Sequence, residues 1–188
     1  MADGPLFVVS GPSGSGKSTV IHSLLRRGVL PLHLAVSATT RPPRPGEVDG
    51  VHYHFWSPER FASELARGTF LEHATIHGKY SYGTPRNEVI DFRQRGIGVI
   101  LDIDVQGFSQ VRLLFPELVS IFIRLPSDEL YEQRIRERGS ESEEEIARRL
   151  ATARYELSRI AEYQYVIVND QLERAVDELQ EILSRYFP

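Results

Sequence analysis

Gly11-Pro12-Ser13-Gly14-Ser15-Gly16-Lys17-Ser18-Thr19 is the stretch that decides the fold of this chain. It follows the apolar run Leu6-Phe7-Val8-Val9, so the motif G-x-x-x-x-G-K-[ST] stands between a predicted strand and a predicted helix. The glycines let the backbone turn its N–H groups inward, and the positive end of the helix attracts anions. We expect Lys17 to reach the outer phosphates of a nucleotide and the Ser18 hydroxyl to ligate Mg²⁺. The alternative, a glycine-rich turn that binds nothing, fits less well because the motif and both flanks agree.

The composition of the 188 residues is that of a soluble globular protein, with 41% hydrophobic and 26% charged residues. No apolar run reaches membrane-spanning length and the N-terminus lacks a signal pattern, so we expect a cytoplasmic protein without a membrane partner. There is no cysteine, which excludes disulfides and thiolate metal sites. The net charge of −4 argues against a broad nucleic-acid-binding face, so local arginine clusters must meet any polyanion.

Strand and helix patterns alternate along the chain, which predicts a parallel α/β sheet with right-handed crossovers. The expected strands are 5–10, 32–37, 51–56, 97–104, 118–125 and 165–169, with a hairpin over 69–84. The expected helices are 16–27 (ending at Gly28), 58–67, 85–95, 127–138, 142–162 and 171–186. Gln106-Gly107 are expected in the turn after the strand 97–104, and residues 37–84 form a small, mixed, strand-rich insert.

A second candidate anion site follows from the segment Thr39–Glu47, in which three prolines exclude a helix and predict an extended, exposed loop. Arg41 and Arg44 stand three positions apart on this stiff loop. They are either solvent-facing residues or an anion site. We favour the anion site because the loop follows a phosphate-binding motif and the arginine fork matches phosphate oxygens.

Two aspartates, Asp102 and Asp104, stand at the end of the most apolar run, Ile97-Gly98-Val99-Ile100-Leu101. Ligands of parallel sheets bind beyond the carboxyl ends of the strands, which favours a functional role for both carboxylates. The alternative is a simple cap for the following helix. The six histidines show no spacing typical of metal ligands.

The phosphate loop makes a nucleoside triphosphate the default ligand, whose γ-phosphoryl group goes either to water or to a second substrate. The insert supplies the makings of a second pocket, with Arg41, Arg44, Tyr53 and Tyr82 as donors for a monophosphate and Glu72 for the edge of a base. Guanine offers adjacent N–H donors, so Glu72 would select it over adenine. We therefore expect two anion-holding pockets that face each other, and transfer to a second substrate.

Eight blocks spread over the whole chain share one pattern: Ser10–Ser18, Val36–Glu47, Gly50–Tyr53, Phe70–Glu72, Tyr82–Thr84, Ile100–Gly107, Arg138–Glu141 and Val166–Asn169. Together they resemble guanylate kinase, a P-loop nucleoside monophosphate kinase, from end to end. The first block alone would indicate only a P-loop protein. The second block, with Tyr53 and Glu72, is specific to this family.

The resemblance implies a P-loop NTPase fold and transfer of the γ-phosphoryl group of ATP to GMP, with dGMP as a further candidate acceptor and Mg²⁺ as cofactor. It implies a single compact domain built of a core (1–36, 85–126 and 163–188), a GMP-binding insert (37–84) and a helical lid (127–162). The implied ATP-binding residues are Gly11 to Thr19, Arg138 and Asn169. The implied GMP-binding residues are Ser37, Arg41, Arg44, Tyr53, Glu72, Tyr82, Thr84, Asp102, Asp104 and Arg149. The implied catalytic residues are Lys17, Arg41, Arg138 and Arg149, and the implied Mg²⁺ ligand is Ser18, with Asp102 acting indirectly.

One departure from the family pattern lies at Gly78-Lys-Tyr-Ser-Tyr-Gly-Thr84, which is one residue longer than G-N-Y-Y-G-T and leaves both Tyr80 and Tyr82 as candidates for the phosphate contact. In a phosphoryl transfer from ATP to GMP, placement of the substrates and neutralisation of charge supply the rate, so no general base is required.

Two alternatives stay open: an inactive peptide-binding module of the same fold, and a P-loop kinase for another small phosphate. The intact Lys17 and Ser18 argue against the first. The sequence is compatible with a monomer or a homo-oligomer.

Overall fold

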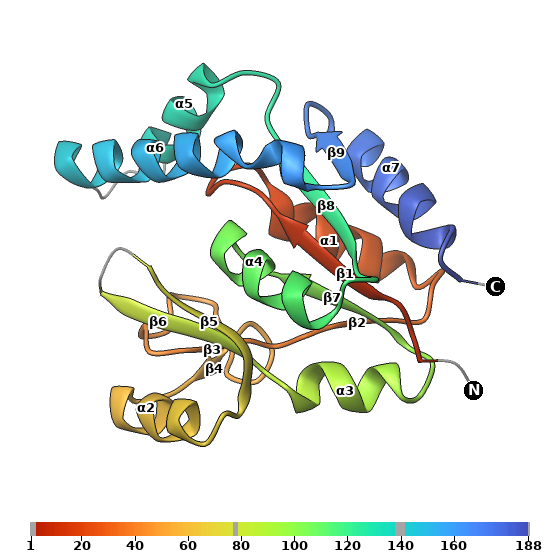
Figure 1. Cartoon of the computed structure of the whole chain (residues 1–188). Helices are drawn as coiled ribbons and strands as arrows, with labels where there is room; N and C mark the ends of the chain where they lie inside the picture. Colours follow the sequence, from red (N-terminus) through yellow and green to blue (C-terminus); the bar gives the residue numbers. More distant parts are fainter. Residues whose placement is uncertain (1–2, 77–78, 138–141, 188) are drawn as a thin grey trace. The chain divides into compact units, whose positions relative to one another are not determined.

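Every residue of strand β1 (Leu6–Ser10) is buried, as its apolar run predicts. The computed structural model describes residues 3–76, 79–137 and 142–187 (Figure 1). The chain forms two units: residues 1–6, 32–101 and 106–118 make the first, and residues 7–31, 102–105 and 119–188 make the second. The boundary crosses β1 after Leu6 and strand β7 (Gly98–Asp102) after Leu101.

The second unit is built on parallel strands. β1 pairs with β8 (Val119–Arg124), for example Val8 with Ser120, and β8 pairs with β9 (Tyr165–Val168), for example Phe122 with Val166. The residues of β8 up to Ile123 are buried, which is typical of a parallel strand covered on both faces.

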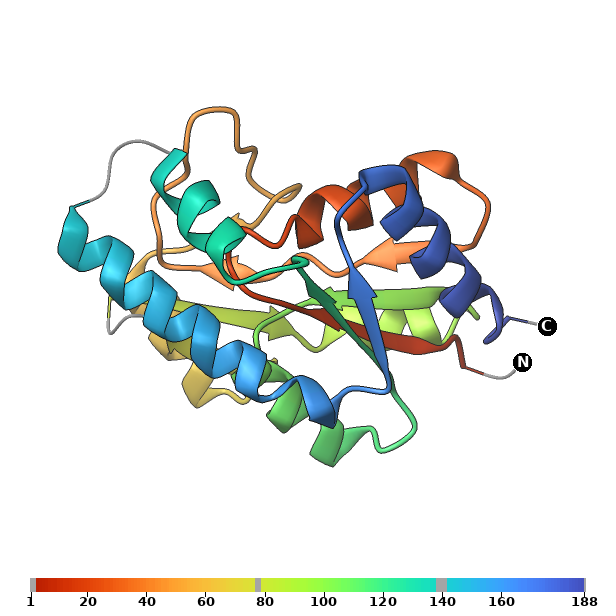
Figure 2. The same ribbon diagram turned by 90° about the horizontal axis from the view of Figure 1, so that it is seen from above.

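Helices cover these strands. α1 (Lys17–Arg27) lies beside α7 (Leu172–Ser184), and α5 (Glu129–Glu137) lies beside α6 (Glu143–Ser158), as Figures 1 and 2 show. α1 ends at Gly28, which has a left-handed φ of 63° and donates its N–H to the Leu25 carbonyl, so the predicted helix end is confirmed. α6 starts with a capping box in which the Ser142 hydroxyl and the Glu145 carboxylate exchange hydrogen bonds with each other's backbone N–H.

The first unit contains a parallel pair and a mixed sheet. β2 (Leu32–Leu34) pairs with β7 in parallel, Leu32 opposite Gly98. The mixed sheet has the order β4-β3-β6-β5, and its strands are β3 (Ala38–Thr39), β4 (His54–Phe55), β5 (Phe70–Ile76) and β6 (Tyr80–Pro85). α2 (Pro58–Ala66) packs on this sheet through Phe61, which stacks on Phe70 with ring centroids 4.5 Å apart. The remaining helices are α3 (Asn87–Arg93) and α4 (Val105–Leu114).

Three of the predicted strands are clearly shorter than expected, two of them because backbone donors find other partners. The strand predicted over 32–37 ends at Leu34 as β2, because the Val36 N–H binds the Glu88 carboxylate at 3.1 Å. The strand predicted over 51–56 is reduced to β4, because the N–H groups of Val51 and His52 turn back to the Val48 carbonyl at 3.2 and 3.1 Å. The strand predicted over 97–104 is β7 and ends at Asp102.

Helix boundaries also differ from the prediction, most clearly at three places. Gln106-Gly107 lie inside α4 and not in a turn, because the helix starts at Val105. The helix predicted over 85–95 starts at Asn87, since Pro85 still pairs with Phe70 at the end of β6. The helix predicted over 142–162 ends at Ser158 and is followed by a short 3₁₀ turn, Ile160–Glu162.

The predicted fold class is confirmed: parallel strands with flanking helices, together with a small mixed sheet. Among the described residues, none of the helices combines the length and the apolar character needed to cross a membrane.

Candidate active site

The loop between β1 and α1 has a shape that only glycine permits at two positions. Gly16 has a φ of 83°, and a Cβ placed on it would lie 2.4 Å from Nδ2 of Asn169. At Gly11 a Cβ would lie 2.1 Å from the carbonyl oxygen of Ile123. The loop therefore lies directly against β8 and the end of β9, and α1 begins at its last residues with N–H groups that can hold an anion.

Asp102 contacts both Lys17, the predicted phosphate-binding residue, and Ser18, the predicted metal ligand. Its carboxylate forms an ion pair with Lys17 and accepts a hydrogen bond of 2.9 Å from the Ser18 hydroxyl. Nζ of Lys17 also lies 3.5 Å from the carbonyl oxygen of Ile103. The predicted association of Asp102 with the metal site has a geometric basis here, because a hydroxyl and a carboxylate are hard oxygen donors of the kind that Mg²⁺ prefers.

Three side chains from later in the chain bind the same loop. Nη2 of Arg149 donates to the Ser13 hydroxyl at 2.6 Å, and Nδ2 of Asn169 donates to the Ser15 carbonyl at 2.8 Å. Nη1 of Arg134 donates to the Gly14 carbonyl at 3.0 Å. Arg149 and Asn169 are predicted site residues. Arg138, predicted to bind ATP, lies outside the described residues.

The sequence pattern does not single out Arg134, because alternating charges on α5 are also typical of a solvated helix, as the pairing of Arg136 with Glu132 and Glu143 illustrates. A signal was available: Arg134 stands four positions before Arg138, the spacing of one helix face.

A second missed residue is Glu156, which lies in α6 and is only 7% exposed. Burial raises the pKa of its carboxyl group to about 7, the nearby Lys17 opposes this shift, and Asp104 adds to it. Asp104, a predicted site residue, is thus within electrostatic range of Glu156 in the second unit. No motif in the sequence marks Glu156, because only the tertiary packing buries it.

In the first unit, three residues predicted to hold a base form one hydrogen-bonded chain. Glu72, 4% exposed on β5, stands opposite Thr84 on β6 and accepts a hydrogen bond of 2.7 Å from its hydroxyl. Since the Thr84 proton goes to Glu72, the hydroxyl of Ser37, 3.0 Å from that of Thr84, must donate to it. The chain gives Glu72 a fixed orientation.

Arg41, Tyr53 and Tyr82 form a second group in this unit. The guanidinium of Arg41 lies over the Tyr53 ring at 5.6 Å, and the Tyr53 and Tyr82 rings meet edge to face at 5.8 Å. The carboxylate of Glu47 and the hydroxyl of Tyr82 both raise the pKa of Arg41. Tyr82 therefore belongs with Arg41, whereas Tyr80 is in contact with Lys79, whose Nζ lies 5.1 Å from its ring centroid.

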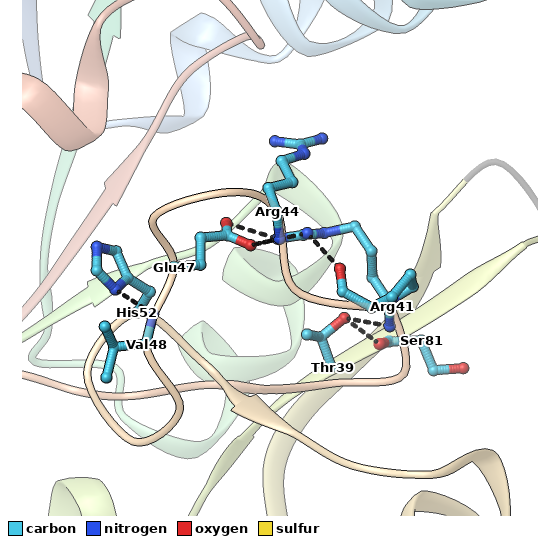
Figure 3. A network of polar contacts seen from close by, with 8 residues as sticks. Thr39, Arg41, Arg44, Glu47, Val48, His52 and Ser81 are labelled. Carbon is cyan, nitrogen blue, oxygen red and sulfur yellow. Dashed lines mark hydrogen bonds and ion pairs between the residues drawn. The ribbon is translucent and has the colours of Figure 1, made fainter.

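The loop that carries the two arginines departs from the expectation that it is exposed. Arg41 is only 8% exposed, because Glu47 holds its guanidinium by two hydrogen bonds of 2.8 and 2.9 Å and the ring of Tyr53 covers it. Arg44 is exposed as expected, and its side chain extends away from Glu47 (Figure 3). Glu47 ends the block Val36–Glu47, but the sequence pattern predicts no role for it.

The chain is similar to proteins of one named family. A family model described as guanylate kinase matches residues 4–186. The chain is 48% identical to the guanylate kinase of Methylobacillus flagellatus over 180 residues, which cover 96% of this chain and 88% of that one. It is 50% identical to the guanylate kinase of Desulfitobacterium hafniense over 181 residues, with 96% and 89% covered. The crystal structure of guanylate kinase from Anaplasma phagocytophilum matches with a TM-score of 0.80 and 34% identity, and covers 98% of this chain and 87% of that one.

Proposed function

This chain belongs to the guanylate kinase family, and on that premise we propose which residues carry each part of its reaction. The enzyme is an ATP:GMP phosphotransferase, which moves the γ-phosphoryl group of ATP to GMP and yields ADP and GDP. Its substrates are nucleotides of the cytoplasm, where we propose that it acts.

ATP binds in the second unit. The backbone N–H groups from Gly11 to Thr19 hold its phosphates, and Lys17 neutralises the outer ones. The helical segment 127–162 supplies arginines to the same site. The contacts of Arg134 and Arg149 with the loop support this assignment, because both guanidinium groups are already held beside the phosphate-binding backbone.

The Ser18 hydroxyl, with Asp102 behind it, fits a bound Mg²⁺. A Mg²⁺ ion held there would supply positive charge that neutralises the phosphates of ATP. Asp102 balances the charge of Lys17 and orients Ser18, which holds both side chains at the phosphate-binding loop.

GMP binds to the insert 37–84. Glu72 accepts the adjacent N–H donors of guanine, supported by Thr84 and Ser37. Arg41, Arg44, Tyr53 and Tyr82 hold the phosphate. The observation that carries this assignment is the buried chain from Ser37 through Thr84 to Glu72, because it fixes a carboxylate that discriminates guanine from adenine.

The chemistry follows from charge. The attacking oxygen of GMP is already anionic, so the residues need only to align it and neutralise the transferred group. Lys17, Arg41, Arg149 and Arg138 are the cations that we assign to this task.

A coupled assay for ADP tests the proposal. Purified enzyme with Mg²⁺ and ATP receives GMP, dGMP, AMP, UMP or no acceptor. We expect rapid ADP formation with GMP and little with AMP, UMP or water. Equal ADP formation without an acceptor would indicate a hydrolase, and a preference for AMP or UMP would indicate a different kinase. No ADP formation under any condition would favour the inactive peptide-binding module.

A further inference from the structure

Glu47 closes the loop that carries the two phosphate-binding arginines. Its Oε1 accepts a hydrogen bond of 2.8 Å from Nη2 of Arg41, and its Oε2 accepts one of 2.9 Å from Nη1 (Figure 3). The same Oε2 accepts a hydrogen bond of 2.6 Å from the backbone N–H of Arg44. A single carboxylate thus fixes the side chain of one arginine and the main chain of the other.

Glu47 and Pro42 use one edge of the Arg41 guanidinium, with which the hydroxyl of Tyr82 also interacts. Glu47 takes the edge formed by Nη1 and Nη2, and the second N–H of Nη1 goes to the Pro42 carbonyl at 2.7 Å. A guanidinium has five N–H donors in a rigid plane, so the edge formed by Nε and Nη2 is a second fork. That fork has the geometry for two oxygens of one phosphate.

Glu47 is built into the loop and is not a loose counter-ion. The backbone N–H of Glu47 donates to the Arg44 carbonyl at 3.0 Å, so the two residues exchange hydrogen bonds in both directions. The Glu47 side chain is 17% exposed, and Arg41 holds the pKa of its carboxyl group below the ordinary value. Displacing this carboxylate from Arg41 would also open the turn at Arg44.

We infer that Glu47 is a positioning residue of the monophosphate site: it holds Arg41 by one edge and the main chain of Arg44, so that the other edge of Arg41 and the side chain of Arg44 meet the phosphate of GMP together. This inference rests on the proposed function, in which these two arginines bind that phosphate. The same carboxylate lowers the net positive charge of the site. Removing the Glu47 carboxylate should therefore weaken GMP binding if its role is positioning, and should strengthen GMP binding if it acts only as a negative charge.

The test compares the affinities of GMP and guanosine, measured by calorimetry for the parent enzyme, Glu47→Gln and Glu47→Asp. The ratio of the two dissociation constants isolates the phosphate contribution. Positioning predicts that both variants lose about 10- to 100-fold of the preference for GMP, while guanosine binding is unchanged. The glutamine cannot accept from both nitrogens of the guanidinium, and the aspartate is too short to reach Arg41 and Arg44 at once.

A matched control is Glu117→Gln. Glu117 accepts a hydrogen bond of 3.2 Å from Arg93, another nearly buried arginine of the same unit, and lies outside the proposed site. This variant should keep the parent ratio. Steady-state kinetics supply a second readout: the KM for GMP should rise in the Glu47 variants, with a smaller change in kcat and an unchanged KM for ATP.

The outcomes distinguish the proposed phosphate site from the positioning role of Glu47. If the parent enzyme bound guanosine with the same affinity as GMP, the proposed phosphate site itself would be refuted. A parent preference for GMP that Glu47→Gln leaves unchanged or strengthens would overturn the positioning role, because a mere counter-charge releases the arginines when removed. If Glu47→Gln fails to fold, Glu47→Asp decides the question: it keeps the charge, so an unchanged ratio would overturn the inference.

Discussion

Lys17 and Asp102 form an ion pair at the start of α1, although 85 positions separate them in the sequence. The Lys17 side chain is 15% exposed, so its charge needs a partner while no phosphate is present. Asp102 also accepts the hydrogen bond from Ser18. The pair therefore links the cation that meets the phosphates to the hydroxyl that meets the metal.

Asp102→Asn should weaken the use of Mg²⁺. The amide removes the charge behind Ser18, and loss of such a supporting partner costs about 10- to 100-fold in metal affinity or activity. The measurement is the Mg²⁺ concentration that gives half-maximal kcat at saturating ATP and GMP. Asp177→Asn is the control, because Asp177 pairs with Arg27 on the surface of the same unit. An unchanged Mg²⁺ requirement in Asp102→Asn would contradict the assignment.

Lys17→Ala should lower kcat by about 100- to 1000-fold, because the variant lacks the cation that neutralises the transferred group. GMP should still bind with the parent affinity, measured by calorimetry in the absence of ATP. The only other lysine of the sequence provides the control: Lys79→Ala should keep the parent kcat. Retained turnover in Lys17→Ala would remove this residue from the mechanism.

Glu72→Gln should weaken GMP far more than ATP, by about 10- to 100-fold, because one of the two acceptors for the guanine N–H groups becomes a donor. Dissociation constants for both nucleotides are the measurement. Glu64→Gln is the matched control, because Glu64 also accepts a hydrogen bond from a threonine hydroxyl. The donor is Thr69, at 2.8 Å, and the pair lies outside the proposed site. Equal losses for GMP and ATP would mean that Glu72 does not bind the base.

Gly16→Ala should abolish tight ATP binding. The residue has a φ of 83°, which costs about 1 kcal/mol for alanine, and its Cβ would in addition collide with the Asn169 amide. Gly28→Ala carries a similar backbone cost at a φ of 63°, but no atom lies within 4 Å of its Cβ. We expect both variants to melt at a lower temperature and only Gly16→Ala to lose ATP. If both variants kept the parent affinity for ATP, the close approach of Asn169 to the loop would not matter.

Glu156 should make the stability of the nucleotide-free enzyme fall as the pH rises from about 4.5 to about 7. Its pKa is raised in the folded state, so the folded protein binds the proton more tightly than the unfolded chain, and that advantage is lost as the pH passes through the folded pKa. The shift corresponds to about 3 kcal/mol at most. Urea unfolding of the parent and Glu156→Gln at several pH values measures the effect. The glutamine variant should gain stability relative to the parent across this range, and parallel curves would contradict the prediction.

Much of the fold follows from local patterns. The glycines of the phosphate loop, the apolar run of β1 and the stop at Gly28 act through backbone dihedrals and residue periodicity, which depend on near neighbours in the chain. The strand and helix ends that the sequence missed have a different origin. The Val36 N–H leaves its strand for the carboxylate of Glu88, a partner 52 positions away.

In the candidate site, too, some features follow from the local sequence and others from the tertiary structure. The sequence by itself determined the phosphate loop and the residue types of the acceptor pocket, because motif spacing and side-chain chemistry specify them. Only the tertiary structure decided that Arg134 reaches the Gly14 carbonyl and that Glu156 is buried near Lys17. It also decided that Glu47 holds Arg41 and that Tyr82 joins them. These relationships depend on which segments the folded chain brings together, and on how much water that packing removes from each charge.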